Sequence, residues 1–290
     1  MTGKIENVYT GGEVVINEDE DKVVSVCGQD LKVCDLNTGA VIHTLPGDTE
    51  GITALAIHPK GTQLVSGSRS MQLHIWDLET GQELRGFKAH TGPVGTLAYD
   101  PTGSFFASGS SDSTVRVWDV EKGYCTHNLR GHKGVVSTVR FHTKPSEWTL
   151  FSAGEDSQIR VWDLITKSCV AVFEGHVSVV TSLDLSTDYH FLFSGSRDRV
   201  VNMWDLRTKK LARTFPIFET VESIHVLPAD APFPGKPEKG KSAKGPTPRP
   251  QYFTIAGDKG LLRIWNSETG QCVFQQTLEE TASQSLLTSM

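Results

Sequence analysis

The chain of 290 residues has no excess of basic side chains, with 28 Lys and Arg against 34 Asp and Glu and a net charge of −6. A general nucleic-acid-binding protein is expected to be basic, so we expect protein partners instead. Only five cysteines occur. They form no CxxC pair and no Cys/His cluster, so no metal site is expected.

Long apolar runs are also absent. No stretch approaches the roughly 18 residues of a membrane-spanning helix, and Met1–Val15 lacks the apolar core of a signal peptide. An odd cysteine count without such a signal favours a reducing compartment. Cys125, Cys169 and Cys272 each follow a tryptophan by seven residues, and this fixed register predicts structural thiols. We therefore expect a soluble, intracellular protein.

A repeat of about 42 residues dominates the sequence. Trp-Asp recurs at Trp76, Trp118, Trp162 and Trp204, and is weakened to Cys34-Asp35 at one end and Trp265-Asn266 at the other. The steps are 42, 42, 44, 42 and 61 residues. Between these positions, short alternating runs of β-branched and aromatic residues are separated by Gly, Asp and Ser, which predicts strands joined by tight turns. Such a period is typical of four-stranded propeller blades.

The unit Gly131–Cys169, with Gly-His near its start and Trp-Asp near its end, resembles the WD40 family, and the resemblance covers essentially the whole chain. It implies an all-β propeller with six recognisable blades in one domain, residues 1–290. The expected blades span about 11–46, 47–88, 89–130, 131–174, 175–215 and 216–278. A Pro/Lys-rich insert at 228–250 in the sixth is expected to be disordered.

Three units share a fixed grid of polar residues, in which Ser precedes Asp by four positions and Asp precedes Trp by six. In the WD40 family these side chains form a hydrogen-bonded chain from the indole N–H through Ser and His to Asp, so that each buried polar group finds a partner. The expected structural tetrads are His90, Ser108, Asp112 and Trp118; His132, Ser152, Asp156 and Trp162; and His176, Ser194, Asp198 and Trp204.

Ser, His and Asp together could also suggest a hydrolase triad. A nucleophile is needed once, at an exposed turn, whereas these residues recur wherever a blade is built. We therefore expect no catalytic residues, no bound cofactor and no metal.

Candidate interaction residues lie where the repeat varies. Ser111, Glu155 and Arg197 directly precede the repeated Asp, as interaction residues on a rigid scaffold would; unconstrained loop residues would vary equally. The insert is either a solvated loop or a docking segment. It carries five basic residues: Lys236, Lys239, Lys241, Lys244 and Arg249.

Four stretches, Val8–Gly12, Val115–Gly131, Gln158–Ser186 and Arg213–Pro228, resemble the first propeller of the transducin-beta-like nucleolar proteins of the U3 small nucleolar ribonucleoprotein. Members of that family have tandem propellers and a helical C-terminal domain, and act in the small-subunit processome that matures pre-ribosomal RNA. The resemblance implies a nuclear, nucleolar scaffold for small ribosomal subunit biogenesis. Its partners would be protein subunits, with mostly indirect association with U3 and pre-ribosomal RNA, no membrane and no small-molecule substrate.

An alternative class comes from Trp204-Asp205-Leu206-Arg207. Substrate receptors of cullin-RING ubiquitin ligases carry such a Trp-Asp-x-Arg pattern, which docks on the ligase adaptor. The corresponding positions of three other units hold Glu79, Glu121 and Ile165 instead.

The ends of the chain predict an incomplete ring. The sixth unit has its own fourth strand at Gln271–Leu278, so a strand at Ile5–Tyr9 has no blade to complete, and a seventh unit would begin near Ser285. We expect an N-terminal fragment that lacks a seventh blade, a second propeller and a C-terminal domain, with six blades in an arc open by one position. A closed six-bladed ring is the alternative.

Overall fold

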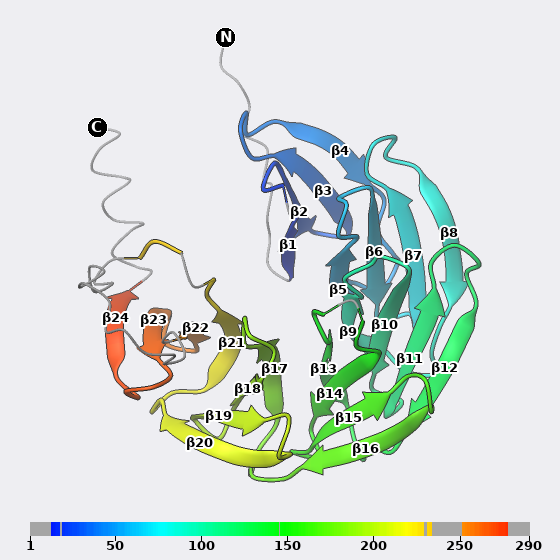
Figure 1. Ribbon diagram of the computed structural model, residues 1–290. Helices are drawn as coiled ribbons and strands as arrows, with labels where there is room; N and C mark the ends of the chain where they lie inside the picture. The colour runs from blue at the N-terminus through cyan, green and yellow to red at the C-terminus, as the bar shows by residue number, and fades with distance from the viewer. Residues whose placement is uncertain (1–12, 18, 145, 229–230, 234–250, 278–290) are drawn as a thin grey trace, which may run out of the picture. The chain divides into compact units, whose positions relative to one another are not determined.

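The computed structural model describes residues 13–17, 19–144, 146–228, 231–233 and 251–277, and every regular element in them is a β-strand (Figure 1). The strands form six four-stranded sheets, and each is an antiparallel meander of consecutive strands. The expectation of an all-β WD40 propeller fold with six blades is confirmed. The chain divides into two compact units, Met1–Asp156 with Arg160–Val172, and Ser157–Ile159 with Phe173–Met290.

Unit 1 holds blades 1 to 4. Their strands are β1 (Val14–Ile16), β2 (Lys22–Cys27), β3 (Asp30–Asp35) and β4 (Val41–Leu45); β5 (Ile52–Ile57), β6 (Gln63–Ser68), β7 (Gln72–Asp77) and β8 (Glu83–Lys88); β9 (Val94–Tyr99), β10 (Phe105–Ser110), β11 (Thr114–Asp119) and β12 (Cys125–Arg130); and β13 (Val136–Phe141), β14 (Thr149–Gly154), β15 (Ile159–Asp163) and β16 (Ser168–Phe173).

Unit 2 holds blades 5 and 6. Their strands are β17 (Val180–Leu185), β18 (Phe191–Ser196), β19 (Val200–Asp205) and β20 (Lys210–Pro216); and β21 (Val221–Val226), β22 (Tyr252–Gly257), β23 (Leu261–Asn266) and β24 (Cys272–Thr277). Most of the insert between β21 and β22 lies outside the described residues, as do Ile5–Tyr9 and Ser285.

The antiparallel order gives each blade two different ends. Turns between the first and second strands, and between the third and fourth, lie at one end, which we call the turn face. The turn between the second and third strands lies at the other end, together with the loop that leads to the next blade; we call this end the loop face.

The β9–β10 turn shows why the chain bends where it does. The backbone N–H of Gly103 donates to the Asp100 carbonyl at 3.0 Å, and Gly103 has a φ of 75°, a conformation that glycine adopts without strain. The Asp100 carboxylate accepts the backbone N–H of Phe105 at 2.7 Å. An Asp at the start of the turn and a Gly at its end therefore fix the register of the two strands.

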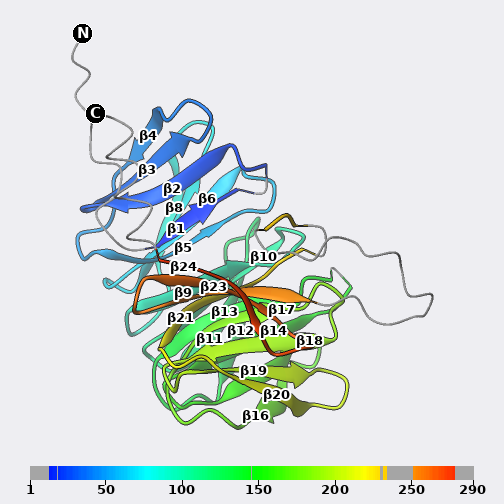
Figure 2. The same ribbon diagram turned by 90° about the vertical axis from the view of Figure 1, so that its left-hand side faces the viewer.

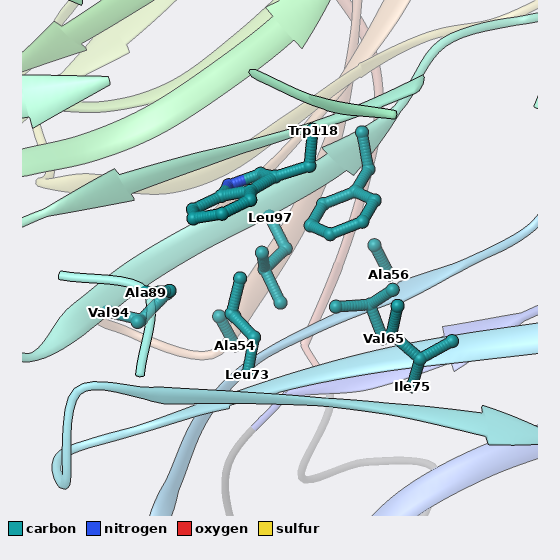
Figure 3. Packing of buried hydrophobic residues seen from close by; sticks show 10 residues of the cluster. Ala54, Ala56, Val65, Leu73, Ile75, Ala89, Val94, Leu97 and Trp118 are labelled. Atoms are coloured by element: carbon teal, nitrogen blue, oxygen red, sulfur yellow. The ribbon is translucent and has the colours of Figure 1, made fainter. Parts of the chain in front are cut away.

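Neighbouring blades within a unit pack through their first strands, β5 against β9 and β9 against β13 in unit 1, and β17 against β21 in unit 2 (Figure 1, Figure 2). Figure 3 shows the layer between blades 2 and 3, where Leu73 and Ile75 of β7 face Leu97 and Trp118. All four side chains are buried. Burial of each such side chain contributes about 1.5–3 kcal/mol, so these apolar layers hold the blades of a unit together.

Aromatic rings fill the corresponding layer of unit 2. The Phe253 ring lies 5.0 Å from the ring of Phe193 and 5.1 Å from that of Phe215, and all three side chains are at most 1% exposed. Offset and edge-on ring pairs of this kind add to the free energy of burial.

Candidate functional site

The second tetrad links two strands of blade 4, β14 and β15, to the turn between them and to the loop before β13. The Trp162 indole N–H donates to Ser152 Oγ at 2.7 Å, and the Ser152 hydroxyl lies 2.7 Å from His132 Nε2. His132 Nδ1 lies 2.9 Å from the Asp156 carboxylate. One proton arrangement satisfies every group, with a neutral imidazole that accepts from Ser152 and donates to Asp156.

The other two expected tetrads have the same geometry. In blade 3 the Trp118–Ser108, Ser108–His90 and His90–Asp112 distances are 2.9, 2.7 and 3.0 Å. In blade 5 the Trp204–Ser194, Ser194–His176 and His176–Asp198 distances are 2.8, 2.7 and 2.8 Å. Each Asp also accepts a backbone N–H from the residue after the His, at 3.0 Å from Thr91, Lys133 and Val177. The tetrads thus fix the loop face to the strands.

Burial shapes the electrostatics of the tetrads. It lowers the pKa of His90, His132 and His176, because desolvation outweighs the attraction of the partner carboxylate. Burial alone would raise the pKa of Asp112. The hydrogen bonds that this carboxylate accepts from Thr114 and Thr91, together with His90, lower that pKa instead.

The serine hydroxyls of the tetrads are inaccessible. Ser108, Ser152 and Ser194 are each 0% exposed. Each hydroxyl oxygen already accepts an indole N–H. A nucleophile must reach a substrate atom, so these three groups cannot act as the serine of a hydrolase triad.

Blade 2 replaces its tetrad with a different network. The Trp76 indole donates to Ser66 Oγ at 3.0 Å, as in the regular blades. Asp48 lies where the His would be, and its carboxylate accepts hydrogen bonds from the hydroxyls of Ser68 and Ser70. The acid therefore occupies the histidine position and Ser70 the position of the usual Asp, while the loop remains tied to the sheet.

Blade 6 uses an ion pair instead. Glu219, in the loop before β21, lies 2.8 Å from Arg263 Nη1 of β23, and its side chain is 0% exposed. A Cβ added to Gly257 would lie 2.5 Å from the Glu219 carboxyl carbon, so the glycine leaves room for the acid. The buried Trp265 indole nitrogen has no hydrogen-bond partner among the described residues.

The candidate interaction residues are divided between the two faces. Ser111, Glu155 and Arg197 lie on the loop faces of three successive blades, in the turns between second and third strands. Glu155 accepts the Val135 backbone N–H at 3.0 Å, and Arg197 lies 3.9 Å from Glu222 in an exposed pair. Arg207 lies on the turn face and is exposed. The insert residues Lys236, Lys239, Lys241, Lys244 and Arg249 lie outside the described residues.

Sequence reasoning missed two exposed apolar side chains on the loop face of unit 2. Val177 is 87% exposed and Phe218 is 75% exposed. Phe218 also has a φ of 66°, which is strained for a bulky residue. The sequence signal that could have revealed them is an apolar residue beside the Gly-His position, where the regular units have polar loop residues.

A further regularity connects consecutive blades. In blades 1, 3 and 5, one side chain of the fourth strand reaches the turn face of the next blade. This residue pairs with the third-strand residue that directly precedes the Trp or Cys of the repeat. His43 Nε2 lies 3.1 Å from the Glu79 carbonyl oxygen, and His127 Nε2 lies 2.8 Å from that of Leu164. Arg213 donates to the carbonyls of Ser267 and Thr269, each at 3.0 Å. We call these residues clamps.

No group of three or more His, Cys, Asp or Glu side chains among the described residues could hold a metal ion. The same residues contain no helix long and apolar enough to cross a membrane.

The repeat, the blades and the tetrads together define a class of protein. The family described as "WD domain, G-beta repeat" matches residues 39–77, 81–119, 123–163 and 167–205, and the chain belongs to this WD40 family. Each match starts beside the fourth strand of one blade and ends with the third strand of the next.

Among curated proteins, the chain is similar to Transducin beta-like protein 3. Identity is 42% over 275 residues with the protein of Bos taurus, and 40% over the same length with those of Rattus norvegicus and Homo sapiens. Each alignment covers 94% of this chain and 33% of the relative. The chain therefore spans about a third of the length of these relatives.

Proposed function

We propose that this chain is a non-catalytic interaction scaffold of the U3 small nucleolar ribonucleoprotein and small-subunit processome, active in pre-ribosomal RNA processing in the nucleolus. The similarity to Transducin beta-like protein 3 along 94% of the chain carries this proposal. It agrees with the four stretches that resemble the transducin-beta-like nucleolar family.

The tetrads support the non-catalytic part of the proposal. Their hydroxyls are buried and already bonded, so the residues most like a catalytic triad stabilise blades instead. Rigid blades with variable loops suit a protein that holds several partners in fixed positions.

The charge of the chain supports protein partners and indirect contact with RNA. A net charge of −6 gives no general attraction for phosphates. The direct partners in this proposal are other protein subunits of the ribonucleoprotein.

A substrate receptor of a cullin-RING ubiquitin ligase is the second candidate. Arg207 favours it, because the residue is exposed and directly follows Trp204-Asp205-Leu206. Its backbone N–H donates to the Asp205 carboxylate at 2.8 Å, so the turn that presents its side chain is fixed.

Affinity purification of the tagged chain from nuclear extract distinguishes the two candidates. The scaffold proposal predicts enrichment of U3 RNA and processome subunits, unchanged in the variant Arg207→Glu. The receptor proposal predicts enrichment of the ligase adaptor, lost in that variant. Enrichment of the adaptor without U3 RNA would overturn the scaffold proposal.

A further inference from the structure

The turn face of unit 1 carries a hollow between blades 2 and 3. It has a volume of about 540 Å³, and Leu84 of β8, Phe105 of β10 and Gln63 of β6 are among its lining residues. Leu84 is 52% exposed although it is apolar. The Gln63 side-chain oxygen is buried and accepts no hydrogen bond among the described residues. The hollow thus offers apolar surface to a partner.

Two exposed apolar side chains of blade 4 lie on the same face. Trp148, in the β13–β14 turn, is 44% exposed and packs edge-on against Phe105, with ring centroids 5.6 Å apart. Ile165, on the turn face of the same blade, is 73% exposed. Thr102 lines both the hollow and a smaller notch beside Trp148, so the two depressions adjoin.

Acidic residues surround this apolar surface. Among the described residues, twelve carboxylates lie in the turns of blades 1 to 4 on this face or at the strand residues that flank them, against five lysines, and Arg85 lines the hollow itself. The carboxylates are Asp19, Glu20, Asp21, Asp35, Asp77, Glu79, Glu83, Asp100, Asp119, Glu121, Glu147 and Asp163, and the lysines are Lys22, Lys60, Lys122, Lys144 and Lys167. Such a field attracts cationic segments and repels the phosphates of RNA.

We propose that this turn face binds a basic, extended segment of a partner protein, which places apolar side chains in the hollow and against Trp148. Alternate side chains of an extended segment can face the surface. Lys and Arg side chains of the segment then reach the surrounding carboxylates, of which Glu79 and Glu121 are exposed.

The basic segment belongs to one kind of partner of the proposed scaffold. Its binding rests on the scaffold function only because both require that the chain binds proteins. The two can fail separately. Purification with U3 RNA can succeed while the turn face binds no peptide, and peptide binding can succeed in a protein of another assembly.

Fluorescence anisotropy with short labelled peptides tests the proposal on the chain as it stands. The probe peptide is GKRLSKRLSG, and its comparison peptides are GEDLSEDLSG, with the charges reversed, and GKRSSKRSSG, without the leucines. We expect the probe to bind at least about tenfold more tightly than either, a difference of about 1.4 kcal/mol. Its affinity falls as the salt concentration rises.

Three variants locate the binding. Trp148→Ala and the double variant E79K/E121K each weaken binding of the probe at least about tenfold. The two glutamates are exposed, so the double variant tests the surface even where Trp148→Ala lowers stability. The matched control is His190→Ala, because the His190 carbonyl accepts the Leu206 N–H in blade 5 as the Trp148 carbonyl accepts the Leu164 N–H. This control leaves binding unchanged.

Several outcomes overturn the proposal. They are no binding of the probe, equal binding of either comparison peptide, full binding by E79K/E121K, or equal loss in His190→Ala. Displacement of the probe by a single-stranded RNA oligonucleotide also overturns it, because that result assigns the surface to RNA.

Discussion

Glu219 and Arg263 form an ion pair 2.8 Å long in blade 6, with the carboxylate completely shielded from solvent. Removal of one partner of a buried pair leaves an uncompensated charge and costs about 3–5 kcal/mol. We therefore expect Glu219→Ala to lower the free energy of unfolding by about this amount, measured by urea denaturation followed through tryptophan fluorescence. The control Glu222→Ala removes an exposed pair and should cost at most about 1 kcal/mol. Equal losses would show that burial does not determine the contribution of this pair.

The central hydroxyl of a tetrad should matter more than a hydroxyl nearby on the loop face. Ser152→Ala leaves the Trp162 indole N–H and His132 Nε2 each without the Ser152 hydroxyl, and an unsatisfied buried group costs about 1–3 kcal/mol. Ser111→Ala, on the loop face of the preceding blade, should change the free energy of unfolding by less than about 0.5 kcal/mol. Calorimetric melting of both variants measures the difference, and similar melting temperatures would contradict the structural role of the tetrad.

Acid should weaken the fold from about pH 6.5 downward, where histidine ordinarily titrates. Burial lowers the pKa of His90, His132 and His176 in the folded state, so the unfolded chain binds more protons below that pH. The histidine contribution to the free energy of unfolding is therefore fully present above about pH 6.5. As the pH decreases below this value, the contribution decreases by at most about 1.4 kcal/mol per pH unit for each site. Asp112 acts in the same direction at lower pH, since its folded pKa is also lowered and its contribution declines progressively as the pH falls below about 3.9.

The contribution of one histidine can be isolated by mutation. Denaturation of His132→Gln between pH 8 and pH 5 should show a shallower dependence on pH than the parent chain. Trp162→Phe weakens the same blade but removes no titrating group, so it should keep the parent slope. A parent slope in His132→Gln would exclude this residue as a source of the acid sensitivity.

Two phenylalanines of unit 2 should respond oppositely to truncation. Phe218 is 75% exposed at a φ of 66°, so Phe218→Gly relieves strain of about 1–2 kcal/mol against a flexibility cost of about 0.5–1 kcal/mol. Its melting temperature should be unchanged or higher. Phe215 is 1% exposed, and Phe215→Ala should cost about 3–5 kcal/mol. A clear loss of stability in Phe218→Gly would show that the exposed ring packs on unit 2.

The blades could be predicted because their determinants are local and repeated. Each Trp-Asp ends a third strand, and the constant intervals from Ser to Asp and from Asp to Trp place the hydroxyl and the indole on adjacent strands, with the carboxylate in the turn between them. The open arc stays a prediction, because it concerns the placement of the two units. The disorder expected for the Pro/Lys-rich insert also stays a prediction.

The features that escaped prediction depend on tertiary neighbours. Glu219 and Arg263 lie outside the tetrad positions, so no repeat marked them as partners. Exposure of Phe218 or Trp148 follows from what packs around each ring, which the alternation of apolar residues does not reveal. The acidic turn face was not predicted, because residues such as Asp77 and Asp119 accept backbone N–H groups in their own turns. This is an ordinary structural role for Asp.

During synthesis, each clamp can form only after the next blade's turn has emerged. His43 can reach its acceptor only after the Glu79 turn has left the ribosome, and His127 must wait for the turn at Leu164. Domains form from the N-terminal end during synthesis, so the sheets of blades 1 and 3 gain their clamp only when the next blade emerges. A chain that terminates inside the blade after a clamp would therefore also lack that clamp in the sheet made before it. Quality-control proteases would then meet two incompletely restrained sheets rather than one.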